Sequence, residues 1–121
     1  MTARRKKGTP VIILRPRIYI GESIRIGPGK IDLLKQVAAT QSISAAARAL
    51  GMSYKHAWLL IDSLAQGFGR PVVTTAIGGK GGGGAALTDL GTQLVERYAA
   101  IEARVNRNAV AELDALRRLA E

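Results

Sequence analysis

The sequence predicts a mainly α-helical domain that also contains two short β-hairpins. Apolar residues recur every three or four positions through most of the chain, which is the period of a helix that packs on one face. Two stretches instead place alternating or β-branched apolar residues beside glycine, which is typical of short strands and tight turns. The chain has 121 residues, so one domain accounts for its length.

Positive charge is the most pronounced feature of the composition. Lys and Arg total 18 against nine acidic residues, which gives a net charge of +9. The excess lies in residues 1–80, whereas residues 81–121 are close to neutral. This asymmetry indicates a polyanionic partner, most often nucleic acid. A membrane surface is the rival, but it favours a basic amphipathic helix, and the basic residues here fall on a tail, short strands and loops.

The residue types that carry most enzyme chemistry are scarce. The chain has no Cys, which excludes disulfides, thiolate metal sites and Cys nucleophiles. The single histidine, His56, has no Ser or Asp partner beside it, and carboxylates do not cluster as in a metal site. The longest apolar run is about five residues, and a bilayer span needs roughly 20. We therefore expect a soluble, cytoplasmic protein that is not an enzyme and binds no metal, cofactor or membrane.

The chain begins with a basic arm, a hairpin and a helix. Residues 1–9 are polar and basic and lack periodicity, so we expect a flexible arm, bounded at residue 15, that lies along a polyanion; a solvated tail without a role is the alternative. Its basic run is Arg4, Arg5, Lys6 and Lys7. Alternating isoleucines around Gly21 predict a hairpin. Pro28 is suited to begin a helix that continues to Thr40. The inner face of that helix is predicted to carry Ile31, Leu34, Val37 and Ala38.

Residues 42–67 predict a helix-turn-helix motif. The first helix is predicted over residues 45–50, with Ser44 as its N-terminal cap. Gly51 follows, where a left-handed backbone ends a helix and forms the turn. The motif needs small side chains where its helices cross, and two adjacent alanines meet that need. Two ordinary packed helices are the alternative interpretation.

The second helix of the motif is predicted to begin at Tyr54 and to end near Gln66. Ser53 precedes it as a cap, and its apolar face consists of Ala57, Leu60, Ile61 and Leu64. In a helix-turn-helix this second helix enters the major groove of DNA with its N-terminal residues. Trp58 is expected mainly to pack against Tyr54. The candidate DNA contacts in the motif are Ser44, Ser53, Tyr54, Lys55 and His56.

A second hairpin is predicted after the motif, which makes the fold a winged helix-turn-helix. Residues 72–77 are strand-like and residues 85–87 form a short return strand, with six glycines around Lys80 between them. Glycine lets the main chain approach phosphates closely, so Lys80 is a candidate contact to the DNA backbone. A nucleotide-binding P-loop is the alternative. It needs a hydroxyl residue directly after the lysine, and glycine stands there instead.

The last segment, residues 88–121, predicts one long helix. Its apolar spacing continues without proline for about 30 residues, or about 45 Å, which exceeds the roughly 25 Å width of the remaining domain. We therefore expect a second copy of the chain to cover the exposed part of its apolar stripe. A helix that folds back on itself as two shorter helices around residues 106–108 is the alternative. The candidate interface residues are Leu94, Tyr98, Ile101 and Val105.

Two strings of residues carry a family resemblance. They are Ser53 to Trp58, read SYKHAW, and Gly78 to Thr88, read GGKGGGGAALT. With their surroundings they resemble the N-terminal DNA-binding domain of the molybdate-responsive transcriptional regulators, the ModE family, over about residues 16–105. The resemblance implies a winged helix-turn-helix that dimerises through its last helix. It also implies DNA contacts from residues 53–56 and from the wing lysine.

These observations predict three segments and one main function. Residues 1–15 form the arm, residues 16–87 the winged helix-turn-helix, and residues 88–121 the dimerisation helix. The predicted function is a homodimeric, sequence-specific regulator that binds double-stranded DNA. Full-length members of the resembling family continue into small β-barrel domains that bind molybdate, so we expect no small-molecule effector to act on this chain directly. The alternative is a dimerisation module that partners a full-length regulator, and duplex binding by the chain alone discriminates the two.

Overall fold

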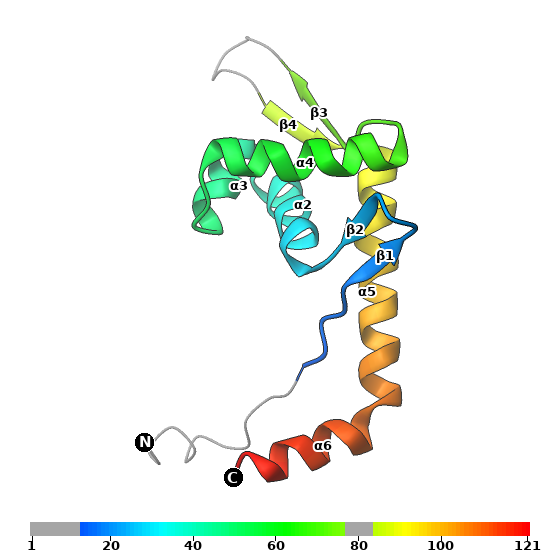
Figure 1. The fold of residues 1–121 in the computed structure, drawn as a ribbon. Coiled ribbons are helices and arrows are strands. Elements are labelled where there is room, and N and C mark those ends of the chain that lie inside the picture. Colours follow the sequence, from blue (N-terminus) through cyan, green and yellow to red (C-terminus); the bar gives the residue numbers. More distant parts are fainter. Residues whose placement is uncertain (1–12, 77–83) are drawn as a thin grey trace.

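The computed structural model describes residues 13–76 and 84–121 of the chain. Figure 1 shows a helical domain at one end of a long helix, with one hairpin projecting from the domain and another beside the long helix. The elements in chain order are β1 (Ile18–Ile20), β2 (Ile24–Ile26), α2 (Pro28–Thr40), α3 (Ile43–Ala49), α4 (Tyr54–Phe68), β3 (Val73–Ala76), β4 (Gly84–Leu87), α5 (Asp89–Asn108) and α6 (Val110–Leu119). The predicted mainly helical fold with two short hairpins is confirmed. In the described ranges, no helix combines the length and apolar character needed to cross a bilayer.

The first hairpin, β1 and β2, packs three of its four isoleucines on the domain, and Ile20 is exposed. The strands are antiparallel, with Ile18 opposite Ile26, and Gly21 adopts a positive φ of 62° in the turn between them. A side chain at Gly67 of α4 would come within 2.8 Å of the Ile24 side chain. Because Gly67 has no side chain, the first hairpin can pack closely against α4 at this point.

Helix α2 forms the centre of the core. It packs against α3, α4, α5 and β4, so it buries residues on more than one side. Leu33 is 1% exposed, although the spacing along the helix places it off the predicted inner face. Ala38, which was predicted to face inward, is exposed, so that assignment is wrong. Pro28 occupies the first turn, as predicted.

The second hairpin, β3 and β4, is joined to the domain at its base. Its strands pair with Val73 opposite Leu87. The backbone N–H of Ala85 donates to the carbonyl of Gln41, at 2.9 Å, and the N–H of Thr88 donates to the carbonyl of Val72, at 3.0 Å. These bonds fix the wing relative to α2 and to the start of α5. The glycine loop between the strands lies outside the described residues.

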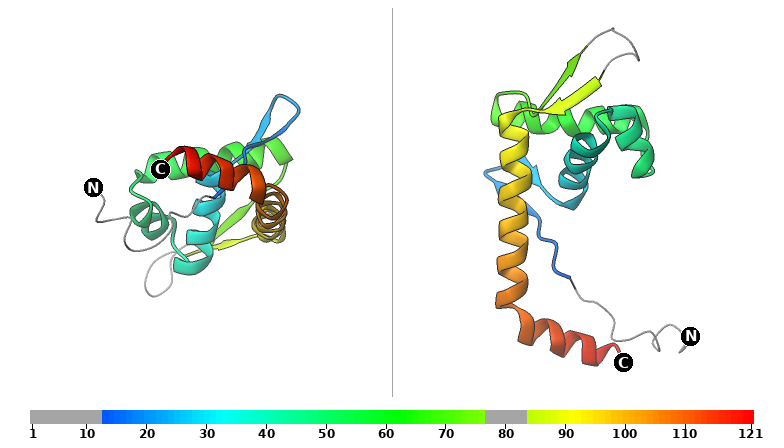
Figure 2. Two further views of the ribbon diagram at one scale, coloured as in Figure 1. Left: turned by 90° about the horizontal axis from the view of Figure 1, so that it is seen from below. Right: turned by 180° about the vertical axis from the view of Figure 1, so that it is seen from behind.

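The predicted single helix at the end of the chain is two helices. Helix α5 has 20 residues and α6 has 10, and the backbone departs from helical geometry at Ala109, with φ of −107° and ψ of 16°. Asn106 and Asn108 have low helix propensity, which favours a break there. The structure therefore has the two shorter helices of the alternative, but not its fold-back. Figure 2 shows that α6 turns away from the axis of α5 rather than folding back along it.

A segment before the first hairpin runs along α5. The Tyr98 hydroxyl donates to the carbonyl of Pro16, at 2.7 Å, and the Asn106 amide exchanges two hydrogen bonds with the backbone of Leu14. Arg15 bridges Asp32 on α2, at 2.7 Å, and Glu102 on α5, at 3.3 Å. Desolvation raises the pKa of Tyr98, whose side chain is buried in its own chain. The prediction that Tyr98 lies on an exposed interface stripe is therefore wrong.

Candidate nucleic-acid interface

The first helix of the motif begins earlier than its sequence predicts. Ser42, not Ser44, caps α3, because its hydroxyl accepts a hydrogen bond from the N–H of Ala45 at 3.0 Å. Ile43 is then the first helical residue and is 5% exposed. Starting the helix at residue 43 buries this isoleucine, which is the physical reason for the shift. Ser44 is left exposed on the outside of α3.

The turn and the start of the second helix match their prediction. Gly51 has a φ of 69°, in the left-handed region that favours glycine. The N–H of Met52 donates to the carbonyl of Ala47 at 3.0 Å and closes the turn. The Ser53 hydroxyl accepts from the N–H of His56 at 3.0 Å, which confirms it as the cap of α4. The motif is thus a helix-turn-helix held by a capped second helix.

Helix α4 has a buried face and an outer face that is open to solvent. The buried residues are Ala57, Ile61 and Leu64. Tyr54, Lys55 and His56 are exposed in its first turn. Among the described residues, no acidic side chain forms an ion pair with Lys55. The candidate contact residues at the start of α4 are therefore accessible to a ligand.

Leu59 was not among the predicted site residues, but it belongs to the outer face of α4. Its side chain is 57% exposed, although leucine is usually buried. It follows Lys55 by four positions and so lies one turn further along the same side of the helix. The helical period places it opposite the buried Ala57 and Ile61, and this was the signal in the sequence that could have found it.

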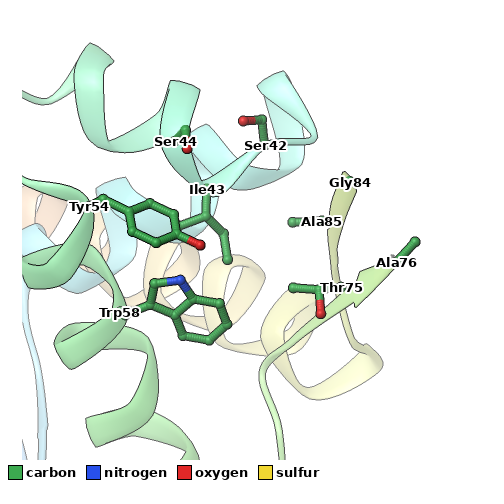
Figure 3. A pocket seen from close by; sticks show the side chains of 9 residues that line it. All are labelled: Ser42, Ile43, Ser44, Tyr54, Trp58, Thr75, Ala76, Gly84 and Ala85. Atoms are coloured by element: carbon green, nitrogen blue, oxygen red, sulfur yellow. The ribbon is translucent and has the colours of Figure 1, made fainter. Parts of the chain in front are cut away.

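An open groove separates the start of α4 from the wing. Figure 3 shows Tyr54 and Trp58 together on one wall, with Thr75 of β3 across from them. The two rings are 6.3 Å apart in an edge-to-face arrangement, and Trp58 packs against the core, as predicted. Ser44 also lines this groove. The groove therefore brings the exposed ends of α3 and α4 next to the wing.

Some predicted site residues fall outside the described ranges. The basic run Arg4, Arg5, Lys6 and Lys7 and the wing residue Lys80 belong to this group. The candidate interface residues on α5 are described: Ile101 is 40% exposed, while Leu94 and Val105 are half-buried in their own chain. Each of these three keeps some surface that a second chain can cover.

The fold and the site together define a class of protein. A capped, outward-facing second helix beside a β-hairpin is the arrangement of winged helix-turn-helix DNA-binding domains. The model of the bacterial regulatory helix-turn-helix proteins of the lysR family matches residues 29–92, more than half of the chain. The chain belongs to this family.

Curated relatives agree with the resemblance read from the sequence. The molybdenum-pterin-binding protein MopB of Rhodobacter capsulatus is 49% identical over 81 residues, which are 67% of this chain and 30% of MopB. The DNA-binding transcriptional dual regulator ModE of Escherichia coli K12 is 46% identical over 71 residues, 59% of this chain and 27% of ModE. The predicted resemblance to the ModE family is confirmed. The matched regions span less than a third of either relative's length.

Solved structures confirm the fold. The DNA-binding domain of CbnR, solved as a complex with DNA, superimposes with a TM-score of 0.54 at 20% identity, covering 77% of this chain and 97% of that one. ArgP from Mycobacterium tuberculosis gives a TM-score of 0.52 at 24% identity, covering 72% of this chain and 30% of ArgP. At these identities the likeness concerns the fold alone.

Proposed function

We propose that this chain is a sequence-specific, ModE-type DNA-binding transcriptional regulator that acts as a homodimer in the cytoplasm. The observation that carries the proposal is the outer face of α4, where Lys55 and Leu59 are exposed beside a wing in a family of regulatory helix-turn-helix proteins. The net charge of +9 supports a polyanionic partner. One structural neighbour, the DNA-binding domain of CbnR, was solved as a complex with DNA, which is consistent with this partner.

In this proposal α4 lies in the major groove and reads base edges. Lys55 is placed at the helix start, where an ammonium group can donate to the O6 and N7 acceptors of guanine. Leu59 offers an apolar surface of the kind that contacts the methyl group of thymine. Ser44, Ser53, Tyr54 and His56 surround them as backbone or base contacts. Lys80 and the basic arm are proposed to contact phosphates.

Replacing Lys55 with alanine is expected to reduce sequence discrimination. Loss of one base contact lowers the preference for a selected duplex over a scrambled one by about 1–3 kcal/mol, or roughly 5- to 150-fold. Competition binding with the two duplexes measures this preference. Arg107→Ala on α5 removes an equal charge far from α4 and should leave the preference unchanged. Equal losses in both variants would contradict the proposed reading role of α4.

The dimer is proposed to form through α5 and α6. Helix α6 buries none of its residues in its own chain. Large apolar side chains are exposed on the two helices, at 40% for Ile101, 61% for Val110, 59% for Leu116 and 83% for Leu119. A second copy of the chain would cover these residues and the open edges of Leu94 and Val105. A two-fold dimer also matches the half-site arrangement that helix-turn-helix proteins use on DNA.

The second candidate function is a dimerisation module that pairs with a full-length regulator. The exposed apolar residues of α6 favour it, because such a surface serves a longer relative as well as a second copy. Binding of a duplex by the purified chain alone separates the two. The regulator is expected to bind with nanomolar affinity at physiological salt, whereas the module would show only salt-sensitive, unselective binding.

Direct binding of molybdate is not expected for this chain. A retained oxyanion needs several donors that converge in an enclosed site, and the groove beside the wing is open to water. Calorimetric titration of the purified protein with molybdate should give no saturable heat. A stoichiometric heat would contradict the prediction and would point to the interface between two copies as the site.

A further inference from the structure

A second groove borders α4 on the side opposite the wing. His56, Leu60 and Ser63 of α4 form one wall. The other walls are the β1–β2 hairpin and the first turn of α2. The groove beside the wing is lined by Tyr54 and Trp58, which lie on the other flank of the same helix. Helix α4 is therefore flanked by one hairpin on each side.

Positive charge collects in this second groove. Arg17, Arg25 and Lys30 line it together with His56, and none of the described residues that line it is acidic. Arg17 directly precedes β1 and stands two positions before Tyr19, which places both on one face of the hairpin. Tyr19 pairs with Arg25 across the strands, which brings Arg25 to that same face. The hairpin thus packs three of its four isoleucines on the core, while its two arginines line the groove.

Lys30 ties the three walls of the groove together. Its ammonium group donates to the carbonyl of Arg25, at 2.8 Å, and to the hydroxyl of Ser63, at 3.2 Å. Desolvation, followed by the charge of Arg25, lowers the pKa of Lys30. The second effect reflects a neighbouring positive charge, and no acidic side chain lines the groove among the described residues. An anionic ligand would balance this positive charge.

We propose that the β1–β2 hairpin is a second backbone-binding element, and that its groove takes the phosphates of duplex DNA. The inference rests on the proposed function, because it needs α4 in the major groove. The major groove of DNA is about 12 Å wide, and one phosphate backbone runs along each of its edges. With α4 between the two DNA strands, the wing contacts the phosphate backbone of one strand and the β1–β2 hairpin contacts that of the other. His56 connects the reading face of α4 to this contact.

The contact is expected to add affinity without sequence preference. Arginine binds phosphate through paired N–H groups, and such contacts position a protein without reading bases. The exposed ring of Tyr19, at 62%, is placed to pack on the sugar-phosphate surface between the two arginines. The electrostatic contribution of each phosphate contact appears as about one unit in the slope of log K against log salt.

The test compares Arg17→Ala/Arg25→Ala with Arg104→Ala/Arg107→Ala. Both variants lose two charges from exposed positions, so both should keep the wild-type thermal unfolding midpoint. The groove variant is expected to flatten the salt slope by about two units per domain and to lose affinity about tenfold for selected and scrambled duplexes alike. The α5 variant should keep both. Arg17→Lys/Arg25→Lys retains the charges and should keep most of the affinity.

Ethylation interference then locates the lost contacts. For the wild-type protein, ethylation of phosphates on both edges of the DNA major groove that α4 enters is expected to interfere with binding. For the Arg17→Ala/Arg25→Ala variant, the interference should be lost on one edge. An unchanged slope and an unchanged interference pattern in the Arg17→Ala/Arg25→Ala variant would overturn the inference and leave the proposed function standing. A wild-type chain that binds no duplex would overturn the proposed function itself.

Discussion

Placing aspartate at both Ile101 and Leu116 is expected to dissociate the dimer. Both side chains are large, apolar and exposed in the single chain, at 40% and 59%. A charge buried in an apolar seam without a partner costs several kcal/mol, and a two-fold dimer would bury each change twice. Sedimentation should show a monomer at micromolar protein where the wild type is dimeric. Affinity for a two-half-site duplex should fall by a hundredfold or more as the second half-site contact is lost.

The same experiment has a matched control in α5. Ala103→Asp adds a charge to an exposed position of the helix that lies away from Ile101 and should leave the dimer intact. The paired change should also leave the folded monomer intact, because neither side chain contributes to the described core. A wild-type chain that sediments as a monomer at micromolar concentration would contradict the dimer. So would a double variant that remains fully dimeric.

Elements with strong local signals could be predicted from the sequence. Glycine at a positive φ, as at Gly51, and a hydroxyl one residue before an apolar period, as at Ser53, determine a turn and a helix start from a few neighbouring residues. The first hairpin follows for the same reason, since its alternating isoleucines and its turn glycine lie within residues 18–26. The residues on the outer face of α4 were within reach through the same helical period, as Leu59 illustrates.

Features that depend on distant parts of the chain could not be predicted. Ser42 and Ser44 are equally good caps by residue type, and the choice between them depends on burying Ile43 against the rest of the domain. Tyr98 fits an interface stripe by its spacing, but it bonds to the carbonyl of Pro16, which is 82 positions away. No local sequence pattern predicts this contact between Tyr98 and Pro16. The groove of arginines beside α4 likewise forms only when the hairpin packs on the helix.

Replacing Gly91 with alanine is expected to cause the largest loss of stability of any single methyl added to the domain. Gly91 lies in the first turn of α5, where a Cβ atom would come 2.3 Å from the carbonyl oxygen of Val72 and 3.3 Å from the Cβ of Leu87. The first neighbour is backbone, which cannot turn aside as a side chain does. That carbonyl also accepts the N–H of Thr88, at 3.0 Å, so any shift disturbs the base of the wing.

Two opposing free energies determine the effect of Gly91→Ala on stability: the helix propensity of alanine and the steric cost of its methyl group. Gly29→Ala measures the first of them alone. Alanine favours a helix over glycine by about 1 kcal/mol, whereas forcing an atom into a packed site costs about 1–3 kcal/mol, and more when backbone must move. Gly29 lies in the first turn of α2 with nothing within 4 Å of an added Cβ, so its replacement should be neutral or stabilising. The free energy of unfolding in urea, at one protein concentration, is expected to fall for Gly91→Ala by at least 2 kcal/mol relative to Gly29→Ala. Two variants of equal stability would show that α5 and the wing do not meet as closely as this contact requires.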